Sequence, residues 1–385
     1  MEPTPPPDDA PSPPPVRQIP DLAGRHASPP PRRRRRLGWV IGFLLIGTPL
    51  LLSCLLLSFV GSLGGTDSAL TQHFHSGDKY GSDKVAIITV SGTILDGEGF
   101  VKKQIDAVRE DKSVRAVVLR VDSPGGTVTG SDYIYHHLNR LCDEKGKELA
   151  QESPKAKARR KIQPLASDSN RLPLVVSMGG MAASGGYYVS MACGTEKDVI
   201  FAEPTTWTGS IGVIIPHYNF AGLMDKFEVQ EDSVKSHPLK QMGAPTRKMT
   251  EQERAIFQEL VDDSFARFKE IVKSGRPAFR EEPAKLDTVA TGQVFTTNQA
   301  IANGLVDKEG FIEEAIDRAL ALAGLEKGKT KVIEFKRQIG LLDSLVATQA
   351  QGSAQPAADL SRLLDLTAPR AYYLSSWLPN LLEKQ

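Results

Sequence analysis

The sequence has little cysteine, and its three cysteines cannot build a disulfide framework across 385 residues. Cys54 lies in an apolar run, so only Cys142 and Cys193 are left to form a bridge, which would need an oxidising compartment. Cys193 lies among small residues, where a free cysteine behaves as a small hydrophobic side chain. The chain also lacks an excess of charge, since 47 Lys and Arg are balanced by 46 Asp and Glu. That balance gives no case for a nucleic-acid partner.

Several catalytic signatures are missing as well. The sequence has no Gly-x-Ser-x-Gly elbow, no His-Glu-x-x-His zinc helix and no Walker phosphate loop. None of the seven histidines lies in a recognisable triad setting. We therefore expect neither a metal nor an organic cofactor. A nucleophile in this chain would need another base, such as a lysine that burial keeps neutral.

The N-terminal region predicts a membrane anchor. Residues 1–36 are rich in proline and end in five arginines, Arg32–Arg36, so we expect a disordered tail. Residues 37–63 then form an uncharged, mostly apolar stretch, which exceeds the roughly 20 residues that a membrane-spanning helix needs. The arginines predict a cytoplasmic N-terminus and place the rest of the chain across the inner (cytoplasmic) membrane. A cleavable signal peptide is the alternative interpretation.

The remaining sequence predicts one folded α/β region between two less ordered ones. Residues 64–83 are polar and suggest a tether, and residues 84–328 alternate short buried strands with helices, which is typical of a largely parallel sheet. Within that region, residues 143–171 are highly charged and suggest an exposed insertion, either a solvated helix and loop or a basic docking surface. Residues 329–385 are predicted to be a C-terminal extension. The elements expected in the folded region are strands at 85–90, 114–121, 174–178 and 199–202, and helices at 101–109, 129–142, 249–275 and 310–323.

Three glycine-rich junctions could carry chemistry. Ser184 follows a buried strand and opens a helix, where free N–H groups and the helix dipole stabilise developing negative charge. Asp122–Gly126 follows another strand, and its glycines could turn N–H groups toward a substrate oxygen. Thr208–Val213 places a further hydroxyl, Ser210, in a glycine-lined turn. Each junction also fits a tight turn that serves packing alone.

Taken together and in order, these segments resemble the signal peptide peptidase A family, also called protease IV. The resemblance covers about residues 85–323. Its motifs are Asp122–Gly126, Ala182–Tyr188, Thr208–Val213, Lys240 ahead of Pro245–Thr250, Gly292–Phe295 with Gln299-Ala300, and Gly304–Asp307.

The resemblance implies a ClpP/crotonase-like β-α-β superhelix and a membrane-bound serine protease with a Ser–Lys dyad. Ser184 would be the nucleophile and Lys240 the general base, although spacing alone does not select Lys240. Ser210 would orient that lysine, while Gly125 or Gly126, together with Gly185 in the helix that Ser184 opens, would support the oxyanion. The family degrades signal peptides left in the membrane, and its short members form rings in which neighbouring subunits build each active site. We therefore expect a homo-oligomer whose partners are apolar peptides and, through residues 37–63, membrane lipid.

Two features differ from the expected family pattern: the charged segment 143–171, and the residues just before Lys240. His237 lies in the second of these, which leaves a histidine-assisted variant open. Two other functions also remain open at the level of sequence. One is a crotonase-like acyl-CoA enzyme, and the other is a non-catalytic membrane scaffold of the same fold.

Overall fold

The computed structural model describes residues 70–151, 170–337 and, for the backbone alone, 372–374. The predicted tail (1–36) and anchor (37–63), the centre of the charged segment and most of the C-terminal extension lie outside these ranges. Within them, no helix is both long enough and apolar enough to cross a membrane.

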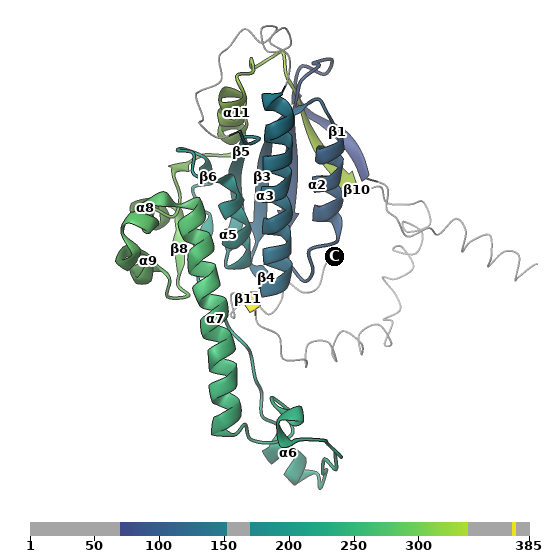
Figure 1. The fold of residues 1–385 in the computed structure, drawn as a ribbon, viewed down its shortest axis with the longest axis vertical. Helices are drawn as coiled ribbons and strands as arrows, with labels where there is room; N and C mark the ends of the chain where they lie inside the picture. The colour runs from purple at the N-terminus through teal and green to yellow at the C-terminus, as the bar shows by residue number, and fades with distance from the viewer. Residues whose placement is uncertain (1–69, 152–169, 338–371, 375–385) are drawn as a thin grey trace, which may run out of the picture. The chain divides into compact units, whose positions relative to one another are not determined.

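A nine-stranded sheet forms the centre of the described region (Figure 1). Its strands follow the order β1-β10-β2-β3-β5-β6-β9, and β7 and β8 extend it beside the end of β5. All neighbours pair in parallel except β1 with β10 and β7 with β8. The strands are β1 (Leu70–Gly77), β2 (Lys84–Ser91), β3 (Val114–Ser123), β5 (Leu174–Ala183), β6 (Ile200–Ala202), β7 (Trp207–Gly209), β8 (Val294–Thr296), β9 (Lys308–Glu309) and β10 (Lys331–Arg337).

The inner strands are buried on both faces, which explains why their sequences are continuous apolar runs rather than alternating ones. From Val85 to Ile88 in β2, and from Ala116 to Leu119 in β3, every residue is at most 2% exposed. The predicted α/β class with a largely parallel sheet is therefore confirmed.

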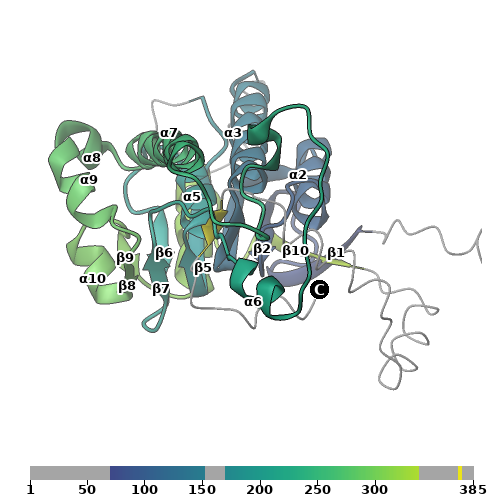
Figure 2. The same ribbon diagram turned by 90° about the horizontal axis from the view of Figure 1, so that it is seen from below.

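Helices cover the sheet. The helices α2, α3 and α5 lie along one side of it (Figures 1 and 2), and α11 contacts β3, β5 and β6. The helices are α2 (Phe100–Glu110), α3 (Val128–Ala150), α5 (Gly185–Ser190), α6 (Ala221–Lys226), α7 (Glu251–Gly275), α8 (Pro277–Glu281), α9 (Pro283–Val289), α10 (Thr297–Ala302) and α11 (Ile312–Ala323), with short 3-10 turns η1 (Met191–Cys193) and η2 (Pro238–Gln241).

Two predicted boundaries differ from the structure. Strand β1 lies inside the predicted tether 64–83, and it joins the sheet by pairing antiparallel with β10. Strand β10 lies inside the predicted extension 329–385, yet it is inserted between β1 and β2. Segments on both sides of the predicted protease region therefore contribute strands to its sheet.

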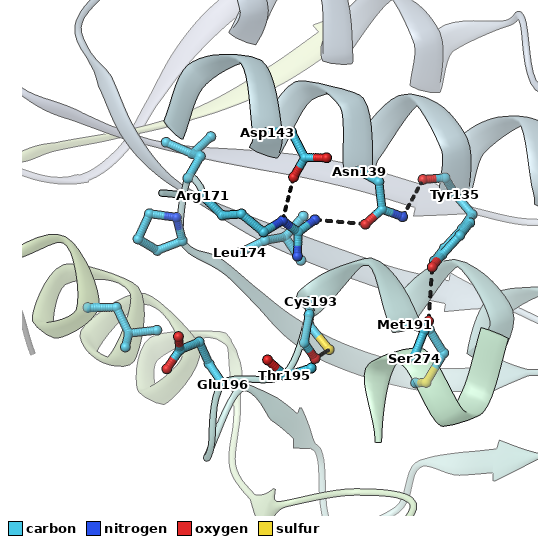
Figure 3. A pocket seen from close by; sticks show the side chains of 14 residues that line it. Tyr135, Asn139, Asp143, Arg171, Leu174, Met191, Cys193, Thr195, Glu196 and Ser274 are labelled. Carbon is cyan, nitrogen blue, oxygen red and sulfur yellow. Dashed lines mark hydrogen bonds and ion pairs between the residues drawn. The ribbon is translucent and has the colours of Figure 1, made fainter. Parts of the chain in front are cut away.

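The charged segment 143–171 does not begin as an exposed insertion. Helix α3 continues to Ala150 instead of ending at residue 142, because Cys142 and Lys145 extend its buried face. The chain returns across this helix at Gly146, where an added Cβ atom would lie 2.0 Å from the carbonyl oxygen of Asn170. There Arg171 forms an ion pair with Asp143 and donates a second hydrogen bond to Asn139 (Figure 3).

The two described cysteines, Cys142 and Cys193, are free thiols in the core, and burial raises the pKa of each to about 12. Cys193 lines the pocket of about 300 Å³ shown in Figure 3, beside the Arg171 cluster. The sequence-based interpretation of Cys193 as a small core hydrophobe is confirmed.

Between β7 and α7 the chain leaves the sheet as an arm, residues 213–250, which contains α6 and η2. Figure 1 shows the arm beyond the end of the sheet, where α7 carries it. A capping box begins α7, since Thr250 and Glu253 each accept a hydrogen bond from the other's backbone N–H. The buried apolar side chains of α7 lie only in the C-terminal half of the helix, at Phe268, Ile271 and Val272.

Candidate active site

Ser184 lies at the junction between β5 and α5 in a strained backbone conformation. Its φ is +55° and its ψ is −114°, values that a non-glycine residue adopts only when its surroundings hold it there. The N–H of Ser184 donates to the carbonyl of Gly209 at 2.8 Å, and its carbonyl accepts from the N–H of Tyr188 at 2.9 Å. A sharp strand-to-helix turn of this kind is how α/β hydrolases present a nucleophile.

The hydroxyl of Ser184 is buried without a partner. The residue is 1% exposed, and its Oγ makes no hydrogen bond to any residue in the described ranges. A buried hydroxyl that makes no hydrogen bond costs stability, so such groups are rare in proteins and occur where a reaction or a ligand requires them. The arrangement fits a nucleophile whose proton acceptor comes from elsewhere.

The start of α5 packs closely against the turn after β3. A Cβ atom on Gly185 would lie 2.4 Å from Ser131 Oγ and 3.1 Å from the backbone nitrogen of Gly126, and one on Gly186 would lie 2.7 Å from the carbonyl oxygen of Ser123. Because larger side chains would push these segments apart, the glycines bring the nucleophile and the Gly125-Gly126 backbone together. Two of the three predicted junctions therefore meet in space.

Gly125 and Gly126 are held differently within β4 (Gly125–Thr127). The N–H of Gly125, a residue with φ of +98°, donates to Ser123 Oγ at 3.1 Å. The other glycine lies against Ile94, whose carbonyl oxygen would be 1.8 Å from an added Cβ atom. The bridge between Gly126 and Ile94 uses the carbonyl of Gly125 and the N–H of Thr127, so the N–H of Gly126 faces the other edge of β4. The sequence left the choice between the two glycines open, and this difference favours Gly126 as the donor to an oxyanion.

The third junction also meets the other two. Strand β7 runs parallel to β5 with Gly209 opposite Ala183, so Ser184 and Ser210 leave neighbouring strands at the same level. Ser210 has a φ of +50°, is 5% exposed and donates its N–H to the carbonyl of Gln293 at 2.7 Å. It opens onto a groove of about 620 Å³ between the β7 loop and α7. Apolar side chains line much of this groove, among them Ile211, Val213, Ile214, Val261 and Phe265.

The structure does not bring Lys240 to Ser184 within one chain. Lys240 lies in η2 on the arm, and its side chain is exposed. It is also not within hydrogen-bonding distance of the Ser184 hydroxyl, which has no partner in the described ranges. His237, also exposed, accepts the N–H of Leu239 at 3.2 Å and so caps η2. Among the described residues of the single chain, no base therefore lies within hydrogen-bonding distance of the Ser184 hydroxyl.

An ion pair that the sequence did not predict holds η2 in position. Arg247 pairs with Glu253, whose side chain is 2% exposed, and donates a further bond to the carbonyl of Gln241 at 3.0 Å. The hydrogen bond from Arg247 is the main reason that the pKa of Glu253 is lowered to about 2. Since Gln241 follows Lys240 directly, this pair joins the lysine turn to the start of α7. Arg247 belongs to the Pro245–Thr250 motif, but the sequence alone does not show that it pairs with Glu253.

The two tyrosines of the Ala182–Tyr188 motif are structural. Both rings are fully buried; the Tyr187 hydroxyl donates to the carbonyl of Leu305, and the Tyr188 hydroxyl donates to Asp132. No group of histidine, cysteine and carboxylate side chains in the described ranges could hold a metal ion.

A strained serine with an unpartnered hydroxyl beside a glycine-bounded backbone defines the site of a serine hydrolase. Comparison with known proteins specifies the class further, because residues 166–326 match the sequence model of peptidase family S49. A protein of Synechocystis sp. with the provisional name of a protease is 35% identical over 250 residues, which cover 65% of this chain and 78% of that relative. A protein of Enterococcus faecium with the provisional name signal peptide peptidase SppA is 35% identical over 269 residues, or 66% of this chain and 67% of its own length.

Protease 4 of Haemophilus influenzae is 31% identical over 303 residues, which cover 74% of this chain but only 43% of that longer relative. The chain belongs to peptidase family S49, the family of the SppA and protease 4 relatives, and it is a serine peptidase. This result confirms the predicted family and class of enzyme, while the roles predicted for individual residues remain predictions.

Proposed function

We propose that this chain is a membrane-anchored serine endopeptidase that cleaves apolar peptides, with Ser184 as nucleophile and Lys240 as base. The observation that carries the proposal is the Ser184 hydroxyl, which is buried, strained and unpartnered beside the Gly125-Gly126 backbone. The provisional name of the Enterococcus relative supports spent signal peptides as substrates. The anchor at 37–63, with the N-terminus in the cytoplasm and the peptidase across the inner membrane, would place the enzyme where such peptides remain.

The proposed chemistry assigns one step to each of these groups. A neutral Lys240 amine takes the proton of Ser184 Oγ as the oxygen attacks the scissile carbonyl. The N–H groups of Gly126 and Gly185 stabilise the oxyanion. When the tetrahedral intermediate collapses, the leaving amine takes the proton back from Lys240, and an acyl-enzyme remains. Lysine then activates a water molecule, which hydrolyses the ester and restores Ser184.

We propose that the lysine comes from a neighbouring copy in a ring-shaped homo-oligomer. The arm that carries it exposes several large apolar side chains, which a protein surface normally covers with a partner. These side chains include Tyr218, Phe220, Leu223, Phe227 and Val229. Beyond the arm, Leu260 on the N-terminal half of α7 is 47% exposed. A neighbour's arm that entered the groove beside Ser210 would bury Lys240 and leave Ser210 to orient its amine.

The sheet order and the positions of the glycine junctions also fit the ClpP/crotonase-like superhelix that we propose for this fold. In that architecture, the strand-to-helix turns gather at one end of the sheet, as Asp122–Gly126, Ser184 and Ser210 do here.

The test combines single and mixed variants of the full chain in detergent. Ser184→Ala and Lys240→Ala should each abolish cleavage of an apolar peptide, while Lys226→Ala, on the same arm, should keep full activity. Each protein should still assemble, as measured by light scattering.

Mixing the two inactive variants after dissociation then tests the neighbour's contribution. In an equal mixture, suppose that each active site takes Ser184 from one copy and Lys240 from its neighbour. Half of the sites then have an intact serine, and half of those also have an intact lysine. About one quarter of the wild-type activity should return, because a head-to-tail interface pairs the copies at random. Full activity in either single variant would refute the dyad, and no recovery in the mixture would place both groups in one copy.

A further inference from the structure

Strands β3 and β5 change register just before the nucleophile. In the regular part of their ladder, Val121 lies opposite Met178. Only two residues farther along β3, Ser123 lies opposite Ala182, so β5 has used four residues where β3 used two. The extra residues lie within 179–181, which we call the β5 bulge. Bulges between parallel strands are rare, and next to active sites they re-aim a side chain.

The β5 bulge sets the level of Ser184 relative to the glycine turn after β3. A regular ladder would place Gly180, rather than Ala182, opposite Ser123. Because a strand advances about 3.3 Å per residue, Ser184 would then lie about 7 Å farther along the direction of β3. At that level the start of α5 would pass beyond the Gly125-Gly126 backbone, which it now contacts. The nucleophile therefore adjoins the proposed oxyanion donors only because β5 is bulged.

Side chains on two sides hold the β5 bulge. From β3, Asp122 Oδ1 accepts the N–H of Met181 at 3.0 Å, a bond that a backbone carbonyl makes in a regular ladder. From the opposite side, Thr206 Oγ1 donates to the carbonyl of Gly179 at 2.6 Å. Thr206 lies in the loop between β6 and β7, the two short strands that pair with β5 before and after the bulge (Figure 2). Thr206 is fully buried whereas Asp122 is exposed, so Asp122 can be changed without opening the core.

The bulge begins at a glycine because β3 approaches it closely. An added Cβ atom on Gly179 would lie 3.0 Å from the guanidinium of Arg120 and 3.2 Å from Asp122. The Arg120 guanidinium forms its ion pair with Glu203, at 2.5 Å. Asp122 therefore lies close against the bulge and supplies an acceptor to it.

We propose that Asp122 is a positioning residue for the peptidase reaction: its carboxylate holds the β5 bulge and so keeps the Ser184 hydroxyl level with the oxyanion donors. The inference rests on the proposed role of Ser184 and adds the group that fixes its level. Asp122 acts through the backbone of β5. Its loss should therefore lower kcat and leave KM almost unchanged, since a misplacement of about 1 Å at a reacting group costs up to about 100-fold in rate.

The test compares two substitutions of Asp122 in the full-length, assembled enzyme. Asp122→Ala removes the acceptor, and we expect it to lower kcat about 10- to 100-fold with little change in KM. Asp122→Asn removes the charge but keeps an oxygen acceptor, and it should retain most of the wild-type kcat. The matched control is Asp78→Ala, because Asp78 likewise accepts a backbone N–H, that of Tyr80 at 2.9 Å, but in the turn between β1 and β2. This control should keep the wild-type kcat.

A serine-directed fluorophosphonate gives a second readout. Its rate of reaction with Ser184 should change in parallel with kcat, because the probe needs the same attack and the same oxyanion donors. All rates are measured on assembled enzyme separated by gel filtration, so that a loss of folded protein does not count as a loss of rate. An equal kcat in wild type and Asp122→Ala would overturn the inference. An equal loss in Asp122→Ala and Asp122→Asn would also overturn it, because the charge rather than the hydrogen bond would then matter. A raised KM with an unchanged kcat would do the same, since Asp122 would then act on substrate binding.

Hydrogen exchange at the Met181 amide separates this inference from the proposed function. The exchange should be about tenfold or more faster in Asp122→Ala than in the wild type, and close to the wild type in Asp122→Asn. Equal exchange in all three proteins would show that Asp122 does not hold the bulge. If the wild type neither cleaves peptides nor reacts with the probe, the proposed function fails instead, and the exchange measurement still tests the hydrogen bond.

Discussion

The body of the fold and the arm differ in how completely a single chain builds them. In the body, Ser184 and Ser210 are nearly inaccessible to solvent, and backbone hydrogen bonds hold both in left-handed conformations. On the arm, Lys240 is exposed, and the apolar side chains of α6 face solvent. If the two residues have the roles proposed for them, Ser184 is already in place within one copy, whereas Lys240 needs a second surface to become buried and neutral. Such a division would keep an unassembled chain inactive.

The largest contrast should come from adding one methyl group to a glycine in each region. In the body, Gly126→Ala places a Cβ atom 1.8 Å from the Ile94 carbonyl oxygen, whereas Gly222 in α6 has no atom within 4 Å of an added Cβ. We expect Gly126→Ala to lower the free energy of unfolding by about 3 kcal/mol, since the backbone itself must move. Gly222→Ala should leave it unchanged or raise it by up to about 1 kcal/mol. Urea unfolding followed by circular dichroism measures both, and equal losses would remove the contrast.

An effect of intermediate size should follow from acidification of the arm. The pKa of Glu253 is lowered to about 2 from 4.5, so its stabilising pair with Arg247 is complete above pH 4.5 and is lost as the pH falls toward 2. The protection factors of residues 237–250, which are exchange rates corrected for the intrinsic effect of pH, should then fall about tenfold or more, as expected for loss of a charged hydrogen bond.

Glu253→Gln should show the faster exchange already at pH 7 and should lose the acid dependence. Glu251→Gln, at an exposed position in the same helical turn, should behave as the wild type. If exchange in Glu253→Gln matched the wild type at pH 7, the ion pair would not hold η2 in position.

The smallest effect is expected at Ser184, whose buried hydroxyl lowers the free energy of unfolding. Ser184→Ala removes a buried hydroxyl without a partner, so the variant should be more stable by up to about 1 kcal/mol although it is inactive. In the same helix, Ser190 is also buried, but its Oγ donates to the carbonyl of Gly186 at 2.8 Å. Ser190→Ala should therefore lose about 1 kcal/mol. Denaturant midpoints of the two variants measure this difference, and a shift of the same sign in both would show that the Ser184 hydroxyl is satisfied.

Much of the body could be predicted from the sequence, because buried parallel strands are continuous runs of β-branched residues and end in glycine turns. This signal located β2, β3, β5 and the Ser184 junction. Strand β1 was missed because it lies at an edge, is half exposed and is polar at Gln72, His73 and His75. The last turns of α3 were missed because charged residues concealed a buried face that includes Lys145.

The site was harder to predict than the fold. Local sequence favours a glycine turn at Ser184, but the strained φ depends on Gly209 and Tyr188, which tertiary structure brings into position. Lys240 could be selected only through the family resemblance, since an exposed lysine on an arm has no local signature. The helix at 249–275 was predicted, yet the pairing of Glu253 with Arg247 depends on how the chain turns before the helix.

The position of β10 has a consequence for biosynthesis. Among the described strands, β1 reaches the sheet only through β10, which is synthesised more than 250 residues later and must enter between β1 and β2. Until Arg337 has left the ribosome, β2 keeps an open edge and β1 has no neighbour, so this half of the sheet closes late. A chain cut short before residue 331 would lose both strands at once. The sheet can therefore close only after residues 331–337 have been synthesised.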